Sequence, residues 1–221
     1  MTNFDELIDS GGCITWVNHY SIQMGAKSTV EYRKFTAVGF DGLLLRRILG
    51  GNLEHSSADV FLPALLIGRN LRVLLAGGTP DSARLHSSSF SSRFPDCVAL
   101  ESLAGDKEVL ESLKESALNL SPDLIILGLG PGLQDLVALE LFEFLSGKNQ
   151  FPLIVTCGGW LDQLSSPSYF PLWSYRLRLN WLLRLVREPR RLWKRYTYWA
   201  ALSLIRRKVI RRTLKGINVL S

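Results

Sequence analysis

The sequence predicts an α/β fold in which a Rossmann-like, mostly parallel sheet carries helices on both faces and a basic helical appendage follows at the C-terminus. Three observations support this prediction. Short apolar runs alternate along the chain with helical patterns, as they do in βαβ units. Glycine-rich segments follow three of these runs. Lysine and arginine are concentrated in the last quarter of the chain.

The composition is that of a folded protein whose charge is unevenly distributed. The chain has 221 residues, of which 47% are hydrophobic and 21% charged, enough for one domain with a substantial core. Residues 171–221 contain 14 of the 26 basic residues and one of the 20 acidic residues, a net charge of +13. The first 170 residues therefore have a net charge of −7. We accordingly divide the chain into an α/β core, residues 1–170, and an appendage, residues 171–221.

The basic appendage predicts a polyanionic partner, which is an anionic lipid surface, a nucleic acid or a diphosphate. Its basic residues lie beside bulky aliphatic and aromatic residues, as in helices that lie on a membrane. The chain contains no recognisable nucleic-acid module. We therefore expect an anionic membrane surface and no nucleic acid, with a solvated basic face on a packed helix as the alternative. An exposed apolar appendage would also suit a homo-oligomer.

The cysteines and the N-terminus favour a cytoplasmic location. Cys13, Cys97 and Cys157 are far apart in apolar runs, which is typical of buried free thiols in a reducing compartment. The first residues include Asp5 and Glu6 and no apolar stretch, so we expect no signal peptide. No uncharged apolar run approaches the roughly 20 residues that span a bilayer. We expect a protein that associates peripherally with the inner face of the cell membrane.

Six segments have the apolar and β-branched composition of strands. Most are continuous apolar runs, as expected for strands buried on both faces of a sheet. The first follows a polar lead-in, residues 1–12, and the second is the weakest because it is short and contains polar residues. The predicted strands are residues 13–17, 34–39, 71–76, 97–100, 123–127 and 152–156.

Helical patterns separate the predicted strands. Residues 105–120 keep apolar residues at helical spacing, and the pattern at 81–94 follows Thr79, a preferred N-cap, and Pro80, a preferred first residue. In the appendage, Glu188-Pro189 divides two helices because proline disfavours helical geometry in the residue before it. The predicted helices are residues 43–48, 59–67, 81–94, 105–120, 133–145 and 172–187, and a further one begins at residue 189.

Glycine and polar residues at the predicted strand ends mark the candidate site. Ligands of parallel sheets bind outside the carboxyl ends of the strands. Three of these ends are glycine-rich, namely Gly77-Gly78, Gly128–Gly132 and Gly158-Gly159, which lets the backbone approach a ligand and favours a nucleotide or nucleotide-sugar site. Asn18 and Asp41 also follow strands. From their positions alone, a helix-capping role is favoured for both over contact with a ligand.

Four sequence boxes, in order, resemble those of the WecG/TagA/CpsF family of bacterial glycosyltransferases. Residues 77–83 are similar to the family's GGxPG…A box, and residues 128–135 to its GLGxPxQE box. Residues 158–162 are similar to GGxFD, and residues 180–191 to EWLxRLxxEPxR, the most specific of the four. The resemblance runs from Ile14 to Tyr196.

The resemblance implies an inverting glycosyltransferase of cell-surface polysaccharide synthesis. Such an enzyme moves a sugar, of the N-acetylmannosamine type or a hexose, from a UDP-sugar to a polyprenyl-diphosphate-linked saccharide. The family's proposed base is the aspartate of an Asp-Gly pair, and this makes Asp41 the catalytic candidate. The substrate-binding residues that the resemblance and the strand ends imply are Asn18, Gly77, Gly78, Gly130, Gln134, Gly158, Gly159, Asp162, Arg184, Arg191 and Lys194.

The leaving diphosphate of such a reaction needs neutralising charge. Many glycosyltransferases supply it with a metal ion held by Asp-x-Asp, a motif that this chain lacks, so we expect no metal and no other cofactor. The resemblance instead assigns the role to Arg184, Arg191 and Lys194 of the appendage. Arginine suits it because the planar guanidinium binds phosphate in bidentate fashion.

Some positions depart from the family pattern. Residues 54–59 lack the arginine and the glycine of the family's Arg-x-x-Gly-x-Asp, and Asn180 stands where a glutamate usually precedes the tryptophan. Trp16-Val17-Asn18 keeps the asparagine of Thr-x-Asn but not its threonine. These departures leave the donor sugar open. The departures at residues 54–59 also favour a rival from another class, a non-catalytic nucleotide-binding module tethered to a membrane or a nucleic acid by its tail.

Overall fold

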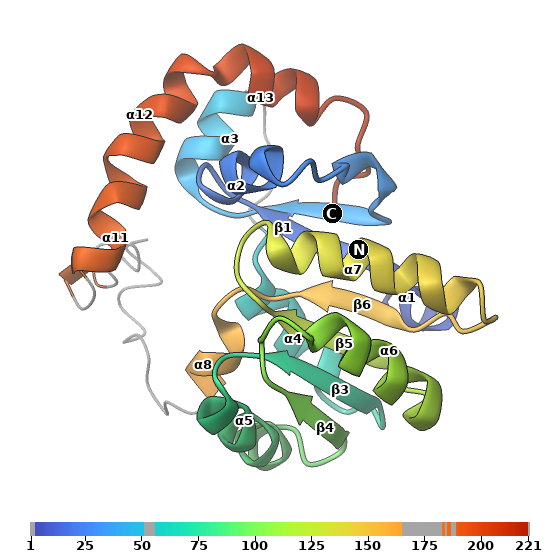
Figure 1. Ribbon diagram of the computed structural model, residues 1–221. Coiled ribbons are helices and arrows are strands. Elements are labelled where there is room, and N and C mark those ends of the chain that lie inside the picture. Colours follow the sequence, from blue (N-terminus) through green and yellow to red (C-terminus); the bar gives the residue numbers. More distant parts are fainter. Residues whose placement is uncertain (1–2, 51–55, 165–182, 184, 187–188, 221) are drawn as a thin grey trace.

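The computed structural model describes residues 3–50, 56–164, 183, 185–186 and 189–220. Its centre is a six-stranded parallel sheet with the order β2-β1-β6-β5-β3-β4 (Figure 1). The strands are β1 (Gly12–Val17), β2 (Ala37–Phe40), β3 (Arg72–Gly77), β4 (Val98–Leu103), β5 (Leu124–Gly128) and β6 (Leu153–Thr156). The predicted Rossmann-like α/β fold is therefore confirmed.

Helices cover both faces of the sheet, and each face has its own hydrophobic cluster. The helices on one face are α2 (Ser21–Lys27), α3 (Leu43–Leu49), α6 (Val109–Leu120), α7 (Leu133–Ser146) and α13 (Arg207–Thr213). Those on the other face are α1 (Phe4–Ser10), α4 (Ala58–Leu66), α5 (Pro80–Arg93) and α8 (Trp160–Leu164).

The strands are continuous apolar runs because both of their faces are buried. In β1, Cys13 and Val17 enter one hydrophobic cluster, whereas Ile14 and Trp16 enter the other. Successive side chains of a strand point to opposite faces, so a strand between two helical layers needs apolar residues at nearly every position. This explains why such runs predict the central strands well.

Local capping fixes the start of α5. Thr79 Oγ1 accepts a hydrogen bond from the Ser82 amide, and Ser82 Oγ accepts one from the Thr79 amide, which forms a reciprocal capping box. Pro80 is the first helical residue. Both predictions for this helix start are confirmed.

Three expectations for secondary structure need correction. Residues 1–12 are not only a lead-in, because Asn3 caps α1 and Phe4 packs edge-on against Phe61 with ring centroids 5.4 Å apart. The second strand begins at Ala37, because residues Tyr32–Lys34 form a 3-10 helix. The fourth strand extends to Leu103 and its partly exposed pattern is that of an edge strand.

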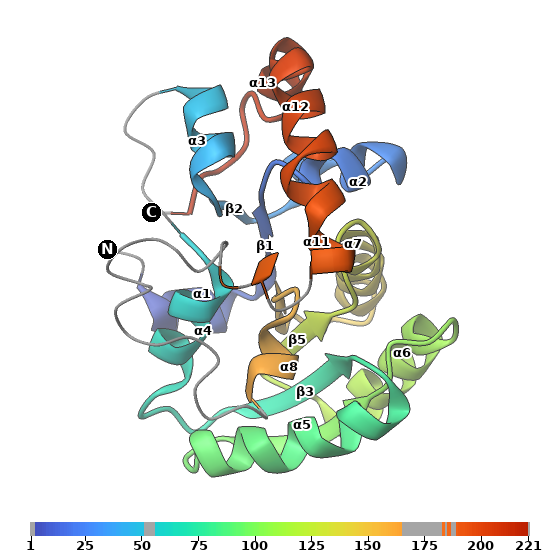
Figure 2. The same cartoon turned by 90° about the vertical axis from the view of Figure 1, so that its left-hand side faces the viewer.

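The C-terminal helices lie against the β2 side of the sheet. They are α11 (Pro189–Tyr196), α12 (Tyr198–Ile205) and α13, and the predicted helix start at Pro189 is confirmed. Ile210 and Leu214 of α13 join the core, and the Val38 amide donates to the Asn218 carbonyl at 2.8 Å. Figure 2, which views the carboxyl ends of the strands, shows α11 on the viewer's side of the sheet, between β1 and α7. The helix predicted at 172–187 lies mostly outside the described residues.

Glycines allow the ends of three neighbouring strands to pack against each other. A Cβ atom on Gly77 would lie 2.7 Å from the Gly128 carbonyl oxygen, and a Cβ atom on Gly128 would lie 2.9 Å from the Gly158 carbonyl oxygen. Real Cβ atoms essentially never approach so closely. The exits of β3, β5 and β6 therefore form one continuous layer of backbone.

The substitution Gly77→Ala tests this packing. It should lower the free energy of unfolding by about 2 kcal/mol or more, because the new methyl group overlaps backbone that cannot move alone. Gly159→Ala is the matched control, since a Cβ atom there would meet no atom of the described residues within 4 Å. It should change stability by less than about 0.5 kcal/mol. Equal midpoints of the two variants in urea denaturation would contradict the packing argument.

Candidate active site

The candidate site lies at the carboxyl edge, which is the edge of the sheet where the strands end. The β3 exit leads to α5 on one face of the sheet, and the β5 exit leads to α7 on the opposite face. Since β3 and β5 are neighbours, their connections diverge at a topological switch point. Ligands of open α/β sheets bind at such points, so the fold itself directs attention to the glycine-rich exits.

The glycines at these exits fall into two groups. Among the described residues, no atom would lie within 4 Å of a Cβ atom on Gly130, Gly158 or Gly159, so the backbone there borders open space. Gly77 and Gly78 are confined instead, and a Cβ atom on Gly78 would lie 2.2 Å from Ser82 Oγ. The geometry therefore favours ligand contact at the first group, and gives the second group a packing role.

Gln134 connects two of the glycine-rich exits. It lies in the first turn of α7, is 5% exposed, and its Oε1 accepts a hydrogen bond of 3.2 Å from the Gly158 amide. The sequence predicts that Gln134 contacts a sugar or uracil. Within the protein, its side-chain oxygen holds the β6 exit in place beside the β5 exit.

Asp135 is a buried carboxyl group beneath the same edge. Its Oδ1 accepts a hydrogen bond of 2.6 Å from Thr15 Oγ1, which lies 2.8 Å from Thr156 Oγ1. Burial raises the pKa of Asp135 to about 6, and the hydrogen bonds from Thr15 and the Gly132 amide oppose that shift. The carboxyl group reaches back to the amide at the helix cap, so it fixes the start of α7 against β1 and β6.

Asp41 follows β2 at the carboxyl edge and is half-buried. Its amide donates to the Val17 carbonyl at 2.9 Å, which keeps the β2 exit beside the β1 exit. The N-cap of α3 is Gly42, so Asp41 stands one residue before the capping position. The capping role favoured from position alone is therefore not the one observed. Strands lie about 4.8 Å apart, so the β2 and β6 exits are separated by about 10 Å.

Asn18 caps the turn that leads into α2, whereas the N-cap of the helix itself is Tyr20. The Asn18 Oδ1 accepts hydrogen bonds of 3.0 Å from the amides of Tyr20 and Ser21, and the Asn18 amide donates to Ser21 Oγ at 2.8 Å. The Asn18 Cβ lies 3.9 Å from the position of a Cβ atom on Gly42, so this turn adjoins the Asp41-Gly42 pair. Contact between Asn18 and a ligand stays a prediction.

Asp162 lies at the start of α8 and pairs with a buried histidine. His86 Nε2 lies 3.3 Å from Asp162 Oδ1, and the two side chains are 0% and 64% exposed. His86 also lies beside Gly78, since a Cβ atom there would be 2.9 Å from His86 Cε1. His86 thus orients an exposed carboxylate between the β3 and β6 exits.

The three cations predicted from the appendage are only partly described. Arg184 lies outside the described residues, and the structure places Arg191 in α11 without describing its side chain. Lys194, also in α11, is exposed. The helix itself is held near the site, because its Arg195 carbonyl lies 3.1 Å from His19 Nε2 at the β1 exit.

Other parts of the surface suit the expected anionic ligand less well. Two shallow hollows lie along α6, and in the larger one the carboxylates of Glu108, Glu111 and Glu115 outnumber Lys114, the single cation in its described lining. These carboxylates would repel a diphosphate. Among the residues described, no group of three or more histidine, cysteine, aspartate or glutamate side chains could hold a metal ion. The three cysteines are free and buried, as predicted.

The family of the protein follows from comparison with known sequences. Residues 9–217 match the Glycosyl transferase WecG/TagA/CpsF family, and the chain belongs to it. No curated protein matches the sequence. Membership implies a glycosyltransferase of polysaccharide synthesis that uses a sugar-nucleotide donor and a lipid-linked acceptor. In the described part of the chain, every helix is too short or too polar to cross a membrane.

Some polar residues that build the carboxyl edge are not predicted as site residues by the sequence patterns. The first is Thr15, together with its two partners. Asp135 lies 120 residues after Thr15 in the sequence, and Thr156 lies 141 residues after it. The other is His19, whose partner is 176 residues away. The available signal was a polar residue inside or directly after an apolar strand, where a side chain needs a partner once it is buried.

The raised pKa of Asp135 predicts an unusual dependence of stability on pH. The folded protein binds this proton more tightly than the unfolded chain, whose aspartates titrate near 3.9. The unfolding free energy of the wild type should therefore fall, relative to that of Asp135→Asn, by about 2 to 3 kcal/mol as pH rises from about 4 to 7. Urea denaturation at a series of pH values measures this difference. If the unfolding free energies of the two proteins vary with pH in parallel, the pKa of Asp135 is the same in the folded and the unfolded chain, and the prediction is wrong.

Proposed function

We propose that the protein is an inverting glycosyltransferase that moves a sugar, of the N-acetylmannosamine type or a hexose, from a UDP-sugar to a polyprenyl-diphosphate-linked saccharide. The observation that carries this proposal is that Asp41 and three glycine-rich exits lie on the same edge of the sheet, with α11 held at the β1 exit next to Asp41. Family membership supports the reaction class.

The proposed chemistry is a single displacement. An acceptor hydroxyl oxygen attacks the anomeric carbon of the donor, and the Asp41 carboxylate takes the proton of that hydroxyl. The bond between the anomeric carbon and the diphosphate oxygen breaks, and UDP leaves with the bonding electrons. Because attack and departure occur on opposite sides of the carbon, the configuration inverts. The open backbone at Gly130, Gly158 and Gly159 is the part of the edge that a nucleotide-sugar could approach.

The leaving UDP acquires negative charge, and the proposal assigns its neutralisation to the appendage. Arg184, Arg191 and Lys194 remain the candidates. The helix α11 also carries Arg190 and Arg195, so four of its eight residues are basic. A cluster of cations beside the donor diphosphate would stabilise the transition state more than the ground state, because the charge on the leaving group grows as the bond breaks.

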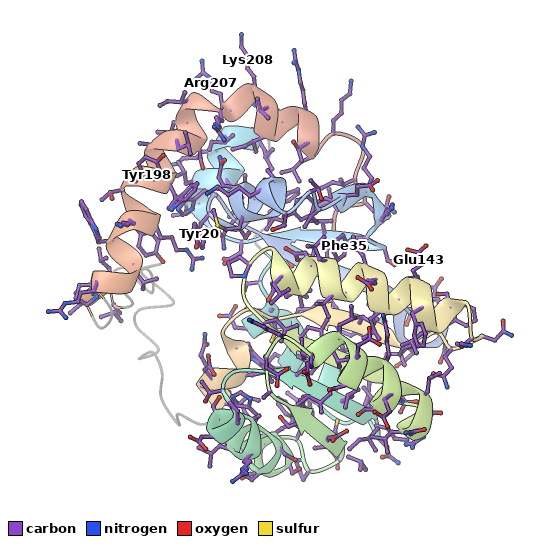
Figure 3. The ribbon with its side chains drawn as sticks, in the orientation of Figure 1. Tyr20, Phe35, Glu143, Tyr198, Arg207 and Lys208 are labelled. Atoms are coloured by element: carbon purple, nitrogen blue, oxygen red, sulfur yellow. The ribbon has the colours of Figure 1, made fainter. Side chains whose placement is uncertain are left out.

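The outer surface of the appendage suits a membrane that holds the lipid-linked acceptor. Several large apolar side chains are exposed there, including Trp193, Tyr198 and Ile205, which are 56%, 61% and 80% exposed. Exposed basic residues accompany them. In Figure 3, Arg207 and Lys208 point away from the body of the protein. Such a mixture allows apolar side chains to enter the interface while the cations meet anionic headgroups.

The rival function is a non-catalytic nucleotide-binding module that the tail tethers to a polyanion. The departures at residues 54–59 favour it, although residues 51–55 lie outside the described residues. Incubation with a panel of UDP-sugars and a polyprenyl-diphosphate-linked saccharide separates the two functions. Release of UDP that requires the acceptor supports the transferase. Binding of UDP without such release supports the rival.

Asp41→Asn tests the proposed base. The variant should lose at least about 100-fold in kcat, since general-base catalysis typically contributes this much, and should bind the UDP-sugar as the wild type does. Asp96→Asn is the matched control, because Asp96 is exposed near the start of β4, at the opposite edge of the sheet. Calorimetric titration with UDP and a UDP-release assay measure the two quantities. Retained turnover in Asp41→Asn would remove the residue from this role.

Replacement of three exposed cations tests the proposed membrane surface. The triple variant Arg206→Gln, Arg207→Gln and Lys208→Gln should bind phosphatidylglycerol vesicles about 100-fold more weakly than the wild type, at about 1 kcal/mol for each charge.

A control variant removes the same charge from other exposed positions, with Arg84, Arg93 and Lys148 changed to glutamine. Cosedimentation with vesicles of phosphatidylglycerol and of phosphatidylcholine measures the binding. Equal loss in both triple variants would show that net charge, rather than this surface, determines the binding.

A further inference from the structure

A buried histidine connects the β1 exit with the appendage. His19 follows Asn18 directly, and its side chain is enclosed, with the residue 7% exposed. Its Nε2 lies 3.1 Å from the Arg195 carbonyl oxygen. A carbonyl oxygen can only accept, so Nε2 carries the proton and donates. The ring also lies near the ring of Tyr196, with centroids 6.1 Å apart.

The carbonyl that His19 reaches lies where the appendage changes direction. Thr197 separates α11 from α12, and its backbone angles of −107° and −80° are not those of a helix. Carbonyl groups at the C-terminal end of a helix lack intrahelical partners and need donors from elsewhere. His19 supplies such a donor from the core of the protein.

The backbone of His19 forms a second connection. Ser203 of α12 is 0% exposed, and its Oγ lies 2.8 Å from the carbonyl oxygens of both His19 and Trp199, which share its proton. The same Oγ accepts from Gln23 Nε2 of α2 at 3.3 Å. His19 is therefore held by α11 through its ring and by α12 through its carbonyl.

Aromatic and cationic side chains surround this connection. The Arg195 guanidinium lies 5.1 Å from the ring centroid of Tyr20, and the Trp199 ring meets the same tyrosine edge-on at 5.8 Å. Lys27 of α2 lies 4.7 Å from the centroid of the Trp199 ring. In Figure 3, Tyr20 lies between α2 and the arch of the C-terminal helices. These contacts all join the segment after β1 to α11 and α12.

We propose that His19 is a positioning residue that docks α11 and α12 on the β1 exit, beside Asp41, and so brings the basic appendage to the site. The docking itself requires no assumption about the reaction. Its consequence for catalysis rests on the function proposed above. His19 acts through the placement of the appendage and does not itself contact the reacting atoms.

The charges that face His19 make this docking sensitive to pH. Burial lowers the pKa of His19, the Arg195 guanidinium acts in the same direction, and the hydrogen bond to the Arg195 carbonyl and the Asp41 carboxylate act against it. The docked protein thus favours the neutral imidazole. The undocked chain binds the proton more readily, so docking is strongest above a pH of about 6.5 and weakens as the pH falls below it.

Hydrogen exchange of the full-length protein tests the docking without reference to activity. In His19→Ala, the amides of residues 198–205 should exchange about 10-fold faster than in the wild type, the effect of losing one hydrogen bond. His19→Gln places an amide nitrogen near the position of Nε2 and should restore most of the protection. His86→Gln is the matched control, because it alters a buried histidine of α5 and should leave the exchange of residues 198–205 unchanged.

Kinetics and pH distinguish docking from a general loss of stability. In a UDP-release assay, His19→Ala should lower kcat about 10-fold or more, and His19→Gln should recover it. Protection of residues 198–205, corrected for the intrinsic exchange rate, should fall below about pH 6.5 in the wild type and stay constant in His19→Gln.

The outcomes separate the two proposals. Faster exchange in His19→Ala that is confined to residues 198–205 supports the docking, even if the wild type transfers no sugar and the proposed function fails. Unchanged exchange in His19→Ala overturns the docking. Equal acceleration in the β3 and β5 amides also overturns it, because the histidine would then only stabilise the fold. A transferase whose kcat is the same in the wild type and in His19→Ala overturns the catalytic consequence.

Discussion

The structure depends on the close approach of three backbone turns at the carboxyl edge of the sheet. Gly77, Gly128 and Gly158 follow adjacent strands, and their backbones approach too closely for side chains to lie between them. This contact lets the connections to α5, α7 and α8 diverge to opposite faces without separating the turns. It leaves the next glycines, at positions 130 and 159, bordering open space. Packing of the turns and access to the edge are thus two effects of one arrangement.

Polar side chains beneath and beside this edge hold its parts in register. Gln134 joins the β5 and β6 exits, and Asp135 with Thr15 joins the start of α7 to β1. Each of these groups is buried, so each needs its partner, because a buried polar group without one costs about 1 to 3 kcal/mol. The energetic need for satisfied hydrogen bonds therefore makes the geometry of the edge rigid. An active site needs such rigidity, because groups that are already in place stabilise the charge of the transition state without having to reorganise.

The sequence predicted the parts of the fold that local patterns determine. The buried strands are recognisable because both of their faces need apolar residues, and the start of α5 because Thr79 and Pro80 suit a helix start for local reasons. The helix α1 is too short to show a clear periodicity, and its Phe4, Leu7 and Ile8 pack against a hydrophobic cluster built by distant residues. Asp135 and His19 were missed as partners because their contacts depend on residues more than 100 positions away. The sequence contains these residues but not the contacts that give them a role.

The segment after β1 shows how a local role can support a distant one. Asn18 caps the turn before α2 with its side-chain oxygen, two residues before the N-cap Tyr20. That capped turn fixes the backbone of the next residue, His19, so its ring faces α11 and its carbonyl faces Ser203. A structural role and a functional one are therefore not alternatives at such a strand end. Because the cap makes the backbone rigid, the residue beside it can hold the C-terminal helices against the β1 exit, next to Asp41.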